Sequence, residues 1–364
     1  MTNKIIADRR LNNLLIVGSK FLRPEQVVQK LGALQAQDYM QVMWAIGLRT
    51  PSASLTDIER AIVDRKIILT WSLRGTIHCV PSEDVKWMLQ LTGSRVVGQA
   101  KSRLAQLGLD NGTLERCREV ITEALKGGRQ ADRSELLRLL EEAGISTGNQ
   151  RGYHILWHCA YQGLICFGPV NGKQQTFVLL DEWVPHSREF SIDESLAELA
   201  LRYFTAHGPA TVNDFAWWAG MTLTDARRGL ETVKGVLFSE QIEGREYWMS
   251  TASVAQPSEE NSGVYLLPGF DEYILGFKDR SAVLKPETAP RIVPGINGVF
   301  LPTLVVDGQV IGIWKRIFKK KGIELVITPF EQLGDSEERV LRAAERYAVF
   351  VGLPLLKIDF ADRA

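Results

Sequence analysis

The order of expected helices and strands repeats three times along residues 1–252. In the first copy, a helix at residues 56–64 precedes IILTWSLRGTIHCV, where Ile67, Leu69 and Trp71 alternate as in a strand and Arg74-Gly75 forms a turn. Helices followed by such a hairpin outline a winged helix. Because three approximate copies of one topology rarely arise by chance, the chain is predicted to consist of small units and not of one large core.

The other copies and the remaining chain complete the predicted architecture. The second copy has helices at 134–143 and 151–162 before LICFG and QQTFVLL, and the third has helices at 194–206, 211–218 and 224–232 before VLFSEQ and REYWMS. After a polar linker at 256–263 the chain is rich in strand formers, with a helix at 336–347. We predict an α+β protein with four domains: winged helix 1 at 1–80, a helical connection and winged helix 2 at 81–185, winged helix 3 at 190–252, and a β-rich, barrel-like domain with a C-terminal helix at 263–364.

The composition is that of a folded protein of the cytoplasm. Hydrophobic residues make up 45% of the 364 residues and charged residues 24%, which argues against intrinsic disorder. The sequence shows neither a signal peptide nor an apolar run long enough to span a membrane. Cys79, Cys117, Cys159 and Cys166 form no C-x-x-C pair, which favours buried thiols over a disulfide framework or a metal site. We expect a monomer with no metal and no cofactor.

Net charge gives no support for nucleic-acid binding, because 43 Lys and Arg residues balance 43 Asp and Glu residues. A balanced total can still contain a basic face. The clearest local excess is WKRIFKKKG at residues 314–322, which has five basic residues and no acidic one. This stretch is either a DNA contact or a solvated hairpin edge whose lysines prevent pairing with other strands.

Two glutamines in three residues, Gln35-Ala36-Gln37, follow the helix that opens at Pro24. In isolation this pattern is typical of a polar helix end. In an extended backbone the two side chains would point to one side, whereas in a continued α-helix they would diverge. Any joint action of the two amides therefore requires the helix to loosen at residues 33–36.

Several sequence segments together resemble those of the bacterial AlkZ-like proteins, which are winged-helix DNA glycosylases related to the YcaQ-type enzymes. They are LQAQD, LRGTIHCV, HGPATVNDFAWWAG, LLPGFDEYILGFKDR and NGVFLPTLVVDGQVIGIW, in the expected order over residues 11–330. The resemblance implies tandem winged helices and a β-barrel-like domain that hold double-stranded DNA on a concave surface. It also implies hydrolysis of the N-glycosidic bond of alkylated purines, chiefly N7-alkylguanine, and in some members the unhooking of interstrand crosslinks.

The resemblance also implies which residues act. The AlkZ-like branch has a catalytic Gln-apolar-Gln motif, which Gln35-Ala36-Gln37 matches, while the YcaQ-like branch has Gln-apolar-Asp. A His-x-Pro element of the family corresponds to His207-Gly208-Pro209. Since these elements include no amine nucleophile, the resemblance points to a monofunctional enzyme that leaves an abasic site.

Two neutral amides suit a substrate whose glycosidic bond is already weakened. An N7-alkylated guanine carries positive charge and leaves as a neutral base, so orienting a water and steadying the sugar cation remain to be done. A glutamine oxygen accepts a hydrogen bond from water, and its amide group donates to a phosphate or sugar oxygen. Asp38 is an alternative base, although its side chain should leave the backbone opposite to Gln37; capping or an ion pair is its other expected role.

The candidate DNA contacts are cationic or aromatic-ring side chains next to the expected hairpins and recognition helix. They are Arg74, His78, His207, Arg227, Arg228, Lys278, Arg280, Lys315 and Arg316. Trp71 and the pair Trp217-Trp218 can stack on bases or belong to the core. His154 and His158 have a metal-ligand spacing but no third ligand, which favours structural histidines.

Two other functions remain open from the sequence. A non-catalytic winged-helix regulator would need base-reading side chains on its recognition helix, and Arg227 with Arg228 is limited support for this. A general alkylation-repair glycosylase of the YcaQ type is the other alternative, against which Gln37 argues because that branch has Asp there.

Overall fold

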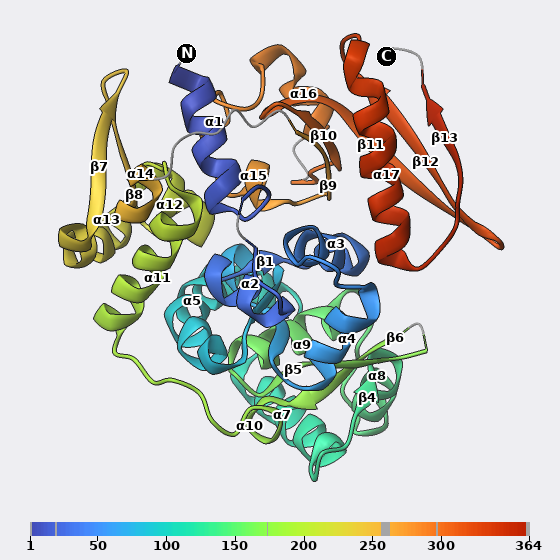
Figure 1. The fold of residues 1–364 in the computed structure, drawn as a ribbon. Coiled ribbons are helices and arrows are strands. Elements are labelled where there is room, and N and C mark those ends of the chain that lie inside the picture. Colours follow the sequence, from blue (N-terminus) through green and yellow to red (C-terminus); the bar gives the residue numbers. More distant parts are fainter. Residues whose placement is uncertain (1, 19, 173, 256–262, 296–297, 362–364) are drawn as a thin grey trace. The chain divides into compact units, whose positions relative to one another are not determined.

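The computed structural model describes residues 2–18, 20–172, 174–255, 263–295 and 298–361 (Figure 1). The chain divides into two compact units. The first, called here the split unit, contains residues 1–58 and 196–364; the second, the continuous unit, contains residues 59–195. The division passes through helices α4 (Leu55–Val63) and α11 (Ile192–His207).

The continuous unit combines helices with an antiparallel sheet. Its helices are α5 (Val85–Gln99), α6 (Lys101–Gln106), α7 (Asn111–Leu125), α8 (Arg133–Glu142), α9 (Arg151–Tyr161) and α10 (Leu180–Trp183). Its strands are β2 (Ile67–Trp71), β3 (Ile77–Pro81), β4 (Ala131–Asp132), β5 (Ile165–Asn171) and β6 (Gln174–Leu179), in the order β3-β2-β5-β6-β4. The two predicted hairpins, β2–β3 and β5–β6, are therefore neighbours in one sheet.

The split unit begins with three helices and a short strand: α1 (Thr2–Asn13), α2 (Pro24–Leu31), β1 (Leu34–Gln35) and α3 (Tyr39–Arg49). Its C-terminal part has strands β9 (Val264–Leu267), β10 (Thr303–Val306), β11 (Gln309–Lys319), β12 (Gly322–Pro329) and β13 (Leu355–Phe360), with helices α15 (Glu272–Leu275), α16 (Ala289–Ile292) and α17 (Glu337–Val351). These strands form one sheet in the order β13-β12-β11-β10-β9, in which β12 and β13 are parallel.

Three aromatic residues pack α3 and α17 against this sheet. The ring of Tyr347 lies 5.1 Å from Trp44 and 5.0 Å from Trp314, both edge-on. Each indole N–H donates to a backbone oxygen of β9, Trp44 to Leu266 at 2.7 Å and Trp314 to Leu267 at 2.8 Å. Because the three rings are buried and both indole N–H groups have acceptors, α3 is fixed on the sheet, and so is the segment that precedes it.

The third predicted copy also lies in the split unit, apart from the start of its first helix. Helices α11, α12 (Val212–Ala219) and α13 (Leu223–Val233) are followed by strands β7 (Leu237–Ile242) and β8 (Arg245–Ser250), and then by α14 (Thr251–Ala255). A capping box between Thr211 and Asp214 starts α12, and Gly220 ends it in the left-handed region at φ 65°. Trp248 of strand β8 is bridged to Ala210, which lies between the first two of these helices.

Most expected elements are present, with differences at specific places. Helix α3 and strand β13 were not predicted, and most of the predicted linker lies outside the described residues. The described strand pairs do not join β9 to β13, so the barrel-like closure is not confirmed. The division between residues 58 and 59 falls within the predicted first winged helix. Among the described residues, no helix is both long and apolar enough to cross a bilayer.

Candidate active site

The glutamine segment occupies a break between two helices of the split unit. Helix α2 ends at Leu31 because Gly32 takes φ 81°, a left-handed conformation that glycine adopts at little cost. Residues 33–36 are non-helical and include β1, the chain then bends at residues 37 and 38, and α3 begins at Tyr39. The loosening that joint action of the amides requires is therefore confirmed.

The two amides differ in their exposure to solvent. Gln35 is 7% exposed, and Ala36 between them is buried at 5%. The Gln37 side chain is exposed and makes no side-chain hydrogen bond within the described part of the chain. A buried amide has a fixed orientation, whereas an exposed one can reach an incoming substrate or water.

Asp38 anchors the end of this segment from two directions. Its carboxylate accepts from the backbone N–H of Gln41 at 3.1 Å and so caps α3. The same carboxylate lies 3.3 Å from the guanidinium of Arg316 on β11. Both roles expected for Asp38 besides a catalytic one are therefore present, and they fix the backbone next to Gln37.

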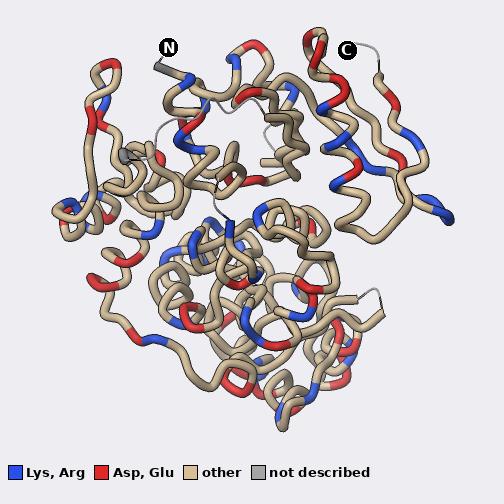
Figure 2. The backbone as a smooth tube through the Cα atoms, viewed as in Figure 1, with Lys and Arg blue, Asp and Glu red and all other residues tan. Residues whose placement is uncertain are grey.

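The basic stretch forms the end of the β11–β12 hairpin, and a run of basic residues marks this tip in Figure 2. Strand β11 pairs with β10 only up to Ile313, so its basic half pairs with β12 alone. Lys315 is exposed with no ion-pair partner among the residues described, whereas Lys319 pairs with Glu324 at 3.3 Å. Arg316 is only 13% exposed and is engaged with Asp38. The two predicted DNA contacts thus differ: Lys315 is available, and Arg316 is a structural partner of the glutamine segment.

A groove of about 1070 Å³ runs between α12, α13, β8 and residues 278–279 of the split unit. Arg227 and Lys278 line it, and neither has an ion-pair partner in the described residues. The other cations along this groove are neutralised, since Arg245 pairs with Asp279 and Lys234 with Glu231. Arg228, next to Arg227 on α13, is also exposed. Arg227 and Lys278 are therefore the cations lining this groove that have no acidic partner among the described residues.

Arg280, in contrast, is held within the protein. Its Nε donates to the backbone oxygen of Ile274 at 2.7 Å, and its guanidinium lies 5.0 Å from the ring of Trp217 and 4.9 Å from that of Phe300. Burial lowers the pKa of Arg280, with Asp214 and Asp279 opposing the shift. The Arg280 side chain therefore packs within the protein and stabilises this edge of the groove.

A family model described as "DNA glycosylase AlkZ-like" matches residues 28–350. The chain belongs to the AlkZ-like DNA glycosylase family. A relative from Streptomyces sahachiroi, the "Interstrand DNA cross-link repair glycosylase", is 27% identical over 363 residues, covering 91% of this chain and 92% of the relative. The solved structure of "Streptomyces sahachiroi DNA glycosylase AlkZ" matches with a TM-score of 0.83 at 24% identity, covering 99% of this chain and all of that one.

As a member of this family the protein is an enzyme, a DNA glycosylase. This excludes the non-catalytic regulator considered from the sequence. In this glycosylase, the match between residues 28 and 350 includes the glutamine segment, the groove and the β11–β12 hairpin.

His207 is a correction to the predicted DNA-contact set. Its side chain is fully buried, its Nε2 lies 3.0 Å from the carboxylate of Glu272, and its ring stacks on Tyr203 at 4.7 Å. The Trp218 indole donates to the same carboxylate at 2.8 Å. A side chain with no exposed surface cannot reach a phosphate, so His207 belongs to a buried polar cluster of the glycosylase and not to its DNA surface.

His78 is corrected for the same reason. It is 1% exposed, and burial together with the neighbouring Arg74 holds its pKa well below the usual value. A neutral, buried imidazole is a poor phosphate contact. Arg74 is half-buried in the left-handed turn at φ 57°, with a guanidinium nitrogen 3.4 Å from Nε2 of His78.

The remaining predictions concern tryptophans that could stack on bases and histidines with a metal-ligand spacing. Trp218 is buried in its unit, which favours the core interpretation of this residue, whereas Trp71 is 5% exposed and lines a pocket of the continuous unit. The described residues contain no cluster of His, Cys, Asp or Glu that could hold a metal ion. Sequence reasoning did not identify Glu272, because its partner His207 is 65 residues away and no local pattern links them.

Proposed function

We propose that this glycosylase hydrolyses the N-glycosidic bond of purines made cationic by N7 alkylation, with Gln35 and Gln37 as its catalytic residues. Water adds to the anomeric carbon of the sugar as the bond to N9 breaks. The bonding electron pair moves to the purine and neutralises its ring, and the proton of the attacking water passes to solvent. One abasic site and one neutral base result.

Each amide has a distinct task in this proposal. The exposed Gln37 accepts a hydrogen bond from the attacking water and orients it toward the sugar. The buried Gln35 contributes a fixed dipole that favours the developing sugar cation. Because an amide cannot accept a full proton at neutral pH, such a site releases cationic adducts and spares ordinary purines.

The observation that carries the proposal is the local geometry of residues 32–38. The left-handed Gly32 ends α2, and the Asp38 carboxylate caps α3 and pairs with Arg316. The backbone of the glutamine segment is therefore non-helical and fixed at both ends before any substrate arrives. Fixed geometry is what catalysis by positioning requires.

We further propose that double-stranded DNA is held by three winged-helix units at 1–80, 81–185 and 190–252 and by the β-rich domain at 263–364. Lys315, Arg227, Arg228 and Lys278 are its proposed phosphate contacts, since each has an exposed side chain. Contacts with several phosphates make affinity fall steeply as salt rises. The enzyme is proposed to act as a cytoplasmic monomer without cofactor and to leave the DNA strand uncut.

Interstrand crosslinks are a proposed substrate as well. The Streptomyces sahachiroi relative is named for cross-link repair, and its similarity extends over 91% of this chain. A general alkylation-repair role of the YcaQ type is the alternative. Gln37 argues against that alternative, because the resemblance places Asp there in the YcaQ-like branch.

The test is base release from duplex DNA that contains N7-methylguanine, followed by alkali to cleave abasic sites. Replacing Gln35 and Gln37 together by Ala should slow release at least about a hundredfold, because the positioned water is lost. Gln29→Ala, which removes an exposed amide from α2, is the matched control and should leave the rate unchanged. Undiminished release by the double variant would refute the catalytic assignment.

A further inference from the structure

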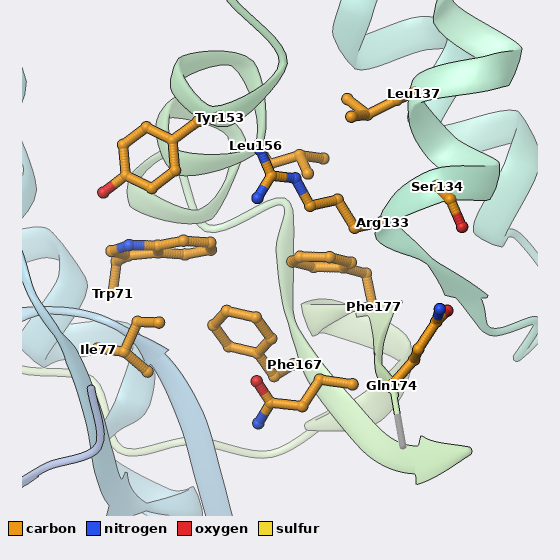
Figure 3. A pocket seen from close by; sticks show the side chains of 11 residues that line it. Trp71, Ile77, Arg133, Ser134, Leu137, Tyr153, Leu156, Phe167, Gln174 and Phe177 are labelled. Carbon is orange, nitrogen blue, oxygen red and sulfur yellow. The ribbon is translucent and has the colours of Figure 1, made fainter. Parts of the chain in front are cut away.

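The continuous unit contains a pocket that neither Gln35 nor Gln37 lines (Figure 3). Its volume is about 530 Å³, and β2, β3, β5, β6, α8 and α9 all contribute to its lining. Every lining residue belongs to residues 59–195, so the pocket is complete within one unit. Its volume is within the range of small-molecule sites.

Three aromatic rings form the inner wall of the pocket. Trp71 lies 4.7 Å from Phe167, and Phe167 lies 4.9 Å from Phe177, measured between ring centroids. Trp71 and Phe177 are nearly parallel, with an interplanar angle of 7°. These three rings are held rigidly by one another and line the pocket with the surface that they still expose, so they make a preformed apolar wall for a flat group.

The rim of the pocket is polar and carries a positive charge. Arg133, at the start of α8, is exposed, and its guanidinium reaches across the pocket toward Tyr153 (Figure 3). Within the described residues Arg133 has no ion-pair partner, and no Asp or Glu lines the pocket. Ser134, Gln174 and Gln175 add a hydroxyl and two amides.

We propose that this pocket binds a nucleotide whose base is unpaired. The base packs on the aromatic wall, the Gln174 and Gln175 amides contact its polar edge, and Arg133 holds the phosphate. Stacking on aromatic side chains combined with a cationic contact to the backbone is how proteins bind single-stranded nucleic acid. An Arg guanidinium matches the geometry of a phosphate, and the amide groups both donate and accept hydrogen bonds.

The absence of lining carboxylates decides against a cationic ligand at this pocket, including an N7-alkylated purine. The nucleotide site is therefore distinct from the glutamine segment in the ligand that it selects. It also goes beyond the proposed hydrolysis, because it concerns undamaged nucleotides and requires no bond to break.

The test compares three ligands on the full chain by isothermal titration: deoxyadenosine monophosphate, deoxyadenosine and inorganic phosphate. We expect the nucleotide to bind at least about tenfold more tightly than the nucleoside, since the phosphate adds a charged contact. Phosphate alone should not bind measurably, because it lacks a base. Binding of phosphate as tight as that of the nucleotide would overturn the proposal.

Variants then assign the contacts. Arg133→Gln should remove the difference in affinity between the nucleotide and the nucleoside. Tyr153→Ala removes an aromatic ring that lines the pocket and should weaken the binding of both ligands. Both side chains are exposed, so neither change should unfold the unit. Arg138→Gln, which removes an exposed guanidinium from the same helix, is the matched control and should change neither affinity. Equal nucleotide binding by the Arg133 and Arg138 variants would overturn the assignment.

A double variant separates this proposal from the glycosylase mechanism. The protein with Gln35 and Gln37 replaced by Ala should bind the nucleotide as the unaltered protein does, whatever its rate of base release. An anilinonaphthalene sulfonate dye distinguishes a nucleotide site from a general apolar cavity. If the dye binds and saturating nucleotide does not displace it, the pocket is only an apolar cavity and the proposal fails.

Discussion

Both units bury aromatic rings, but the buried thiols lie in the continuous unit, whereas most of the buried charged side chains lie in the split unit. All four cysteines lie in the continuous unit and are buried as free thiols. Among its described residues, only Asp84 and His78 are buried side chains of the acidic, basic or histidine type. The corresponding set in the split unit is larger: Asp8, Arg10, Arg49, His207, Asp214, Asp271 and Glu272.

The difference follows from how each unit is assembled along the chain. The continuous unit is one stretch, and local hairpins close its sheet. The split unit joins two distant segments, and polar pairs link them: Arg49 with Asp271, and Asp38 with Arg316. Apolar packing stabilises both units, but a buried ion pair also penalises any arrangement that leaves one partner alone. The paired charges therefore specify how the two segments meet.

The largest expected effect comes from breaking the buried pair in the split unit. Arg49 and Asp271 are almost inaccessible to solvent and form two contacts of 2.8 Å. Asp271→Ala leaves the guanidinium with the backbone oxygens of Leu14 and Ala45 but without a carboxylate. We expect a loss of about 3–5 kcal/mol in the free energy of unfolding, measured by urea denaturation.

The matched control is an exposed pair in the continuous unit. Arg138 and Glu142 lie one turn apart on α8, and both are more than half exposed. Glu142→Ala should cost no more than about 0.5 kcal/mol, because solvent screens the pair. Similar losses for Asp271→Ala and Glu142→Ala would contradict the role assigned to the buried pair.

The same contrast explains which parts of the fold could be predicted from the sequence. The hairpin β5–β6 and the ends of α8 and α9 follow local rules, since Gly144 and Gly163 take the left-handed conformations that stop those helices. Helix α3 was not predicted from the sequence because residues 41–49 are buried on all sides. Such a segment has no polar face and so no helical period to detect.

The candidate site was predictable only in part. The motif Gln35-Ala36-Gln37 and its non-helical backbone could be expected from the residues and the resemblance. The partners that fix it could not, because Asp38 and Arg316 are 278 residues apart. The same limit applies to His207, which looked like a surface contact because Glu272, its buried partner, has no signal in the surrounding sequence.

The second prediction tests the apolar interior of the continuous unit. Cys166 on β5 is fully buried, and burial raises the pKa of its thiol. Cys166→Ser places a hydroxyl among apolar groups, which should cost about 2 kcal/mol in unfolding free energy. Cys166→Ala is the control for lost volume and should cost less. A serine variant as stable as the alanine variant would show that this interior accepts polar atoms as the split unit does.

The third prediction concerns catalysis and the neighbouring residues Lys315 and Arg316. Arg316→Ala removes the partner of Asp38 and should lower kcat for base release about tenfold, since loss of a charged contact loosens the glutamine segment. Lys315→Ala removes only an exposed charge, so it should raise KM and weaken the salt dependence of binding.

Asp38→Asn separates the two functions of that carboxylate. Asparagine still caps α3 but cannot form the ion pair, so the variant should resemble Arg316→Ala in kcat. A pure rise in KM for Arg316→Ala would instead make Arg316 a DNA contact and remove it from the support of the glutamine segment.

The smallest expected effect concerns a cation of the split unit that has no carboxylate partner in the described residues. Lys20 donates to the backbone oxygen of Leu48 at 3.0 Å, and burial, with Arg346 and Arg49 nearby, lowers its pKa to about 7. Below about pH 7 the amine is charged in both the folded and unfolded states, and the folded state bears the full cost of burying that charge. Between about pH 7 and the usual pKa of 10.5 the unfolded state binds the extra proton, so the contribution of Lys20 to stability improves as pH rises.

Lys20→Met should therefore stabilise the protein at pH 6 by about 1 kcal/mol, a modest figure because the amine is partly exposed, and the gain should shrink at pH 9. Urea midpoints of both proteins at the two pH values measure this, and a gain that grows with pH would show that Lys20 is not a buried, unpaired charge.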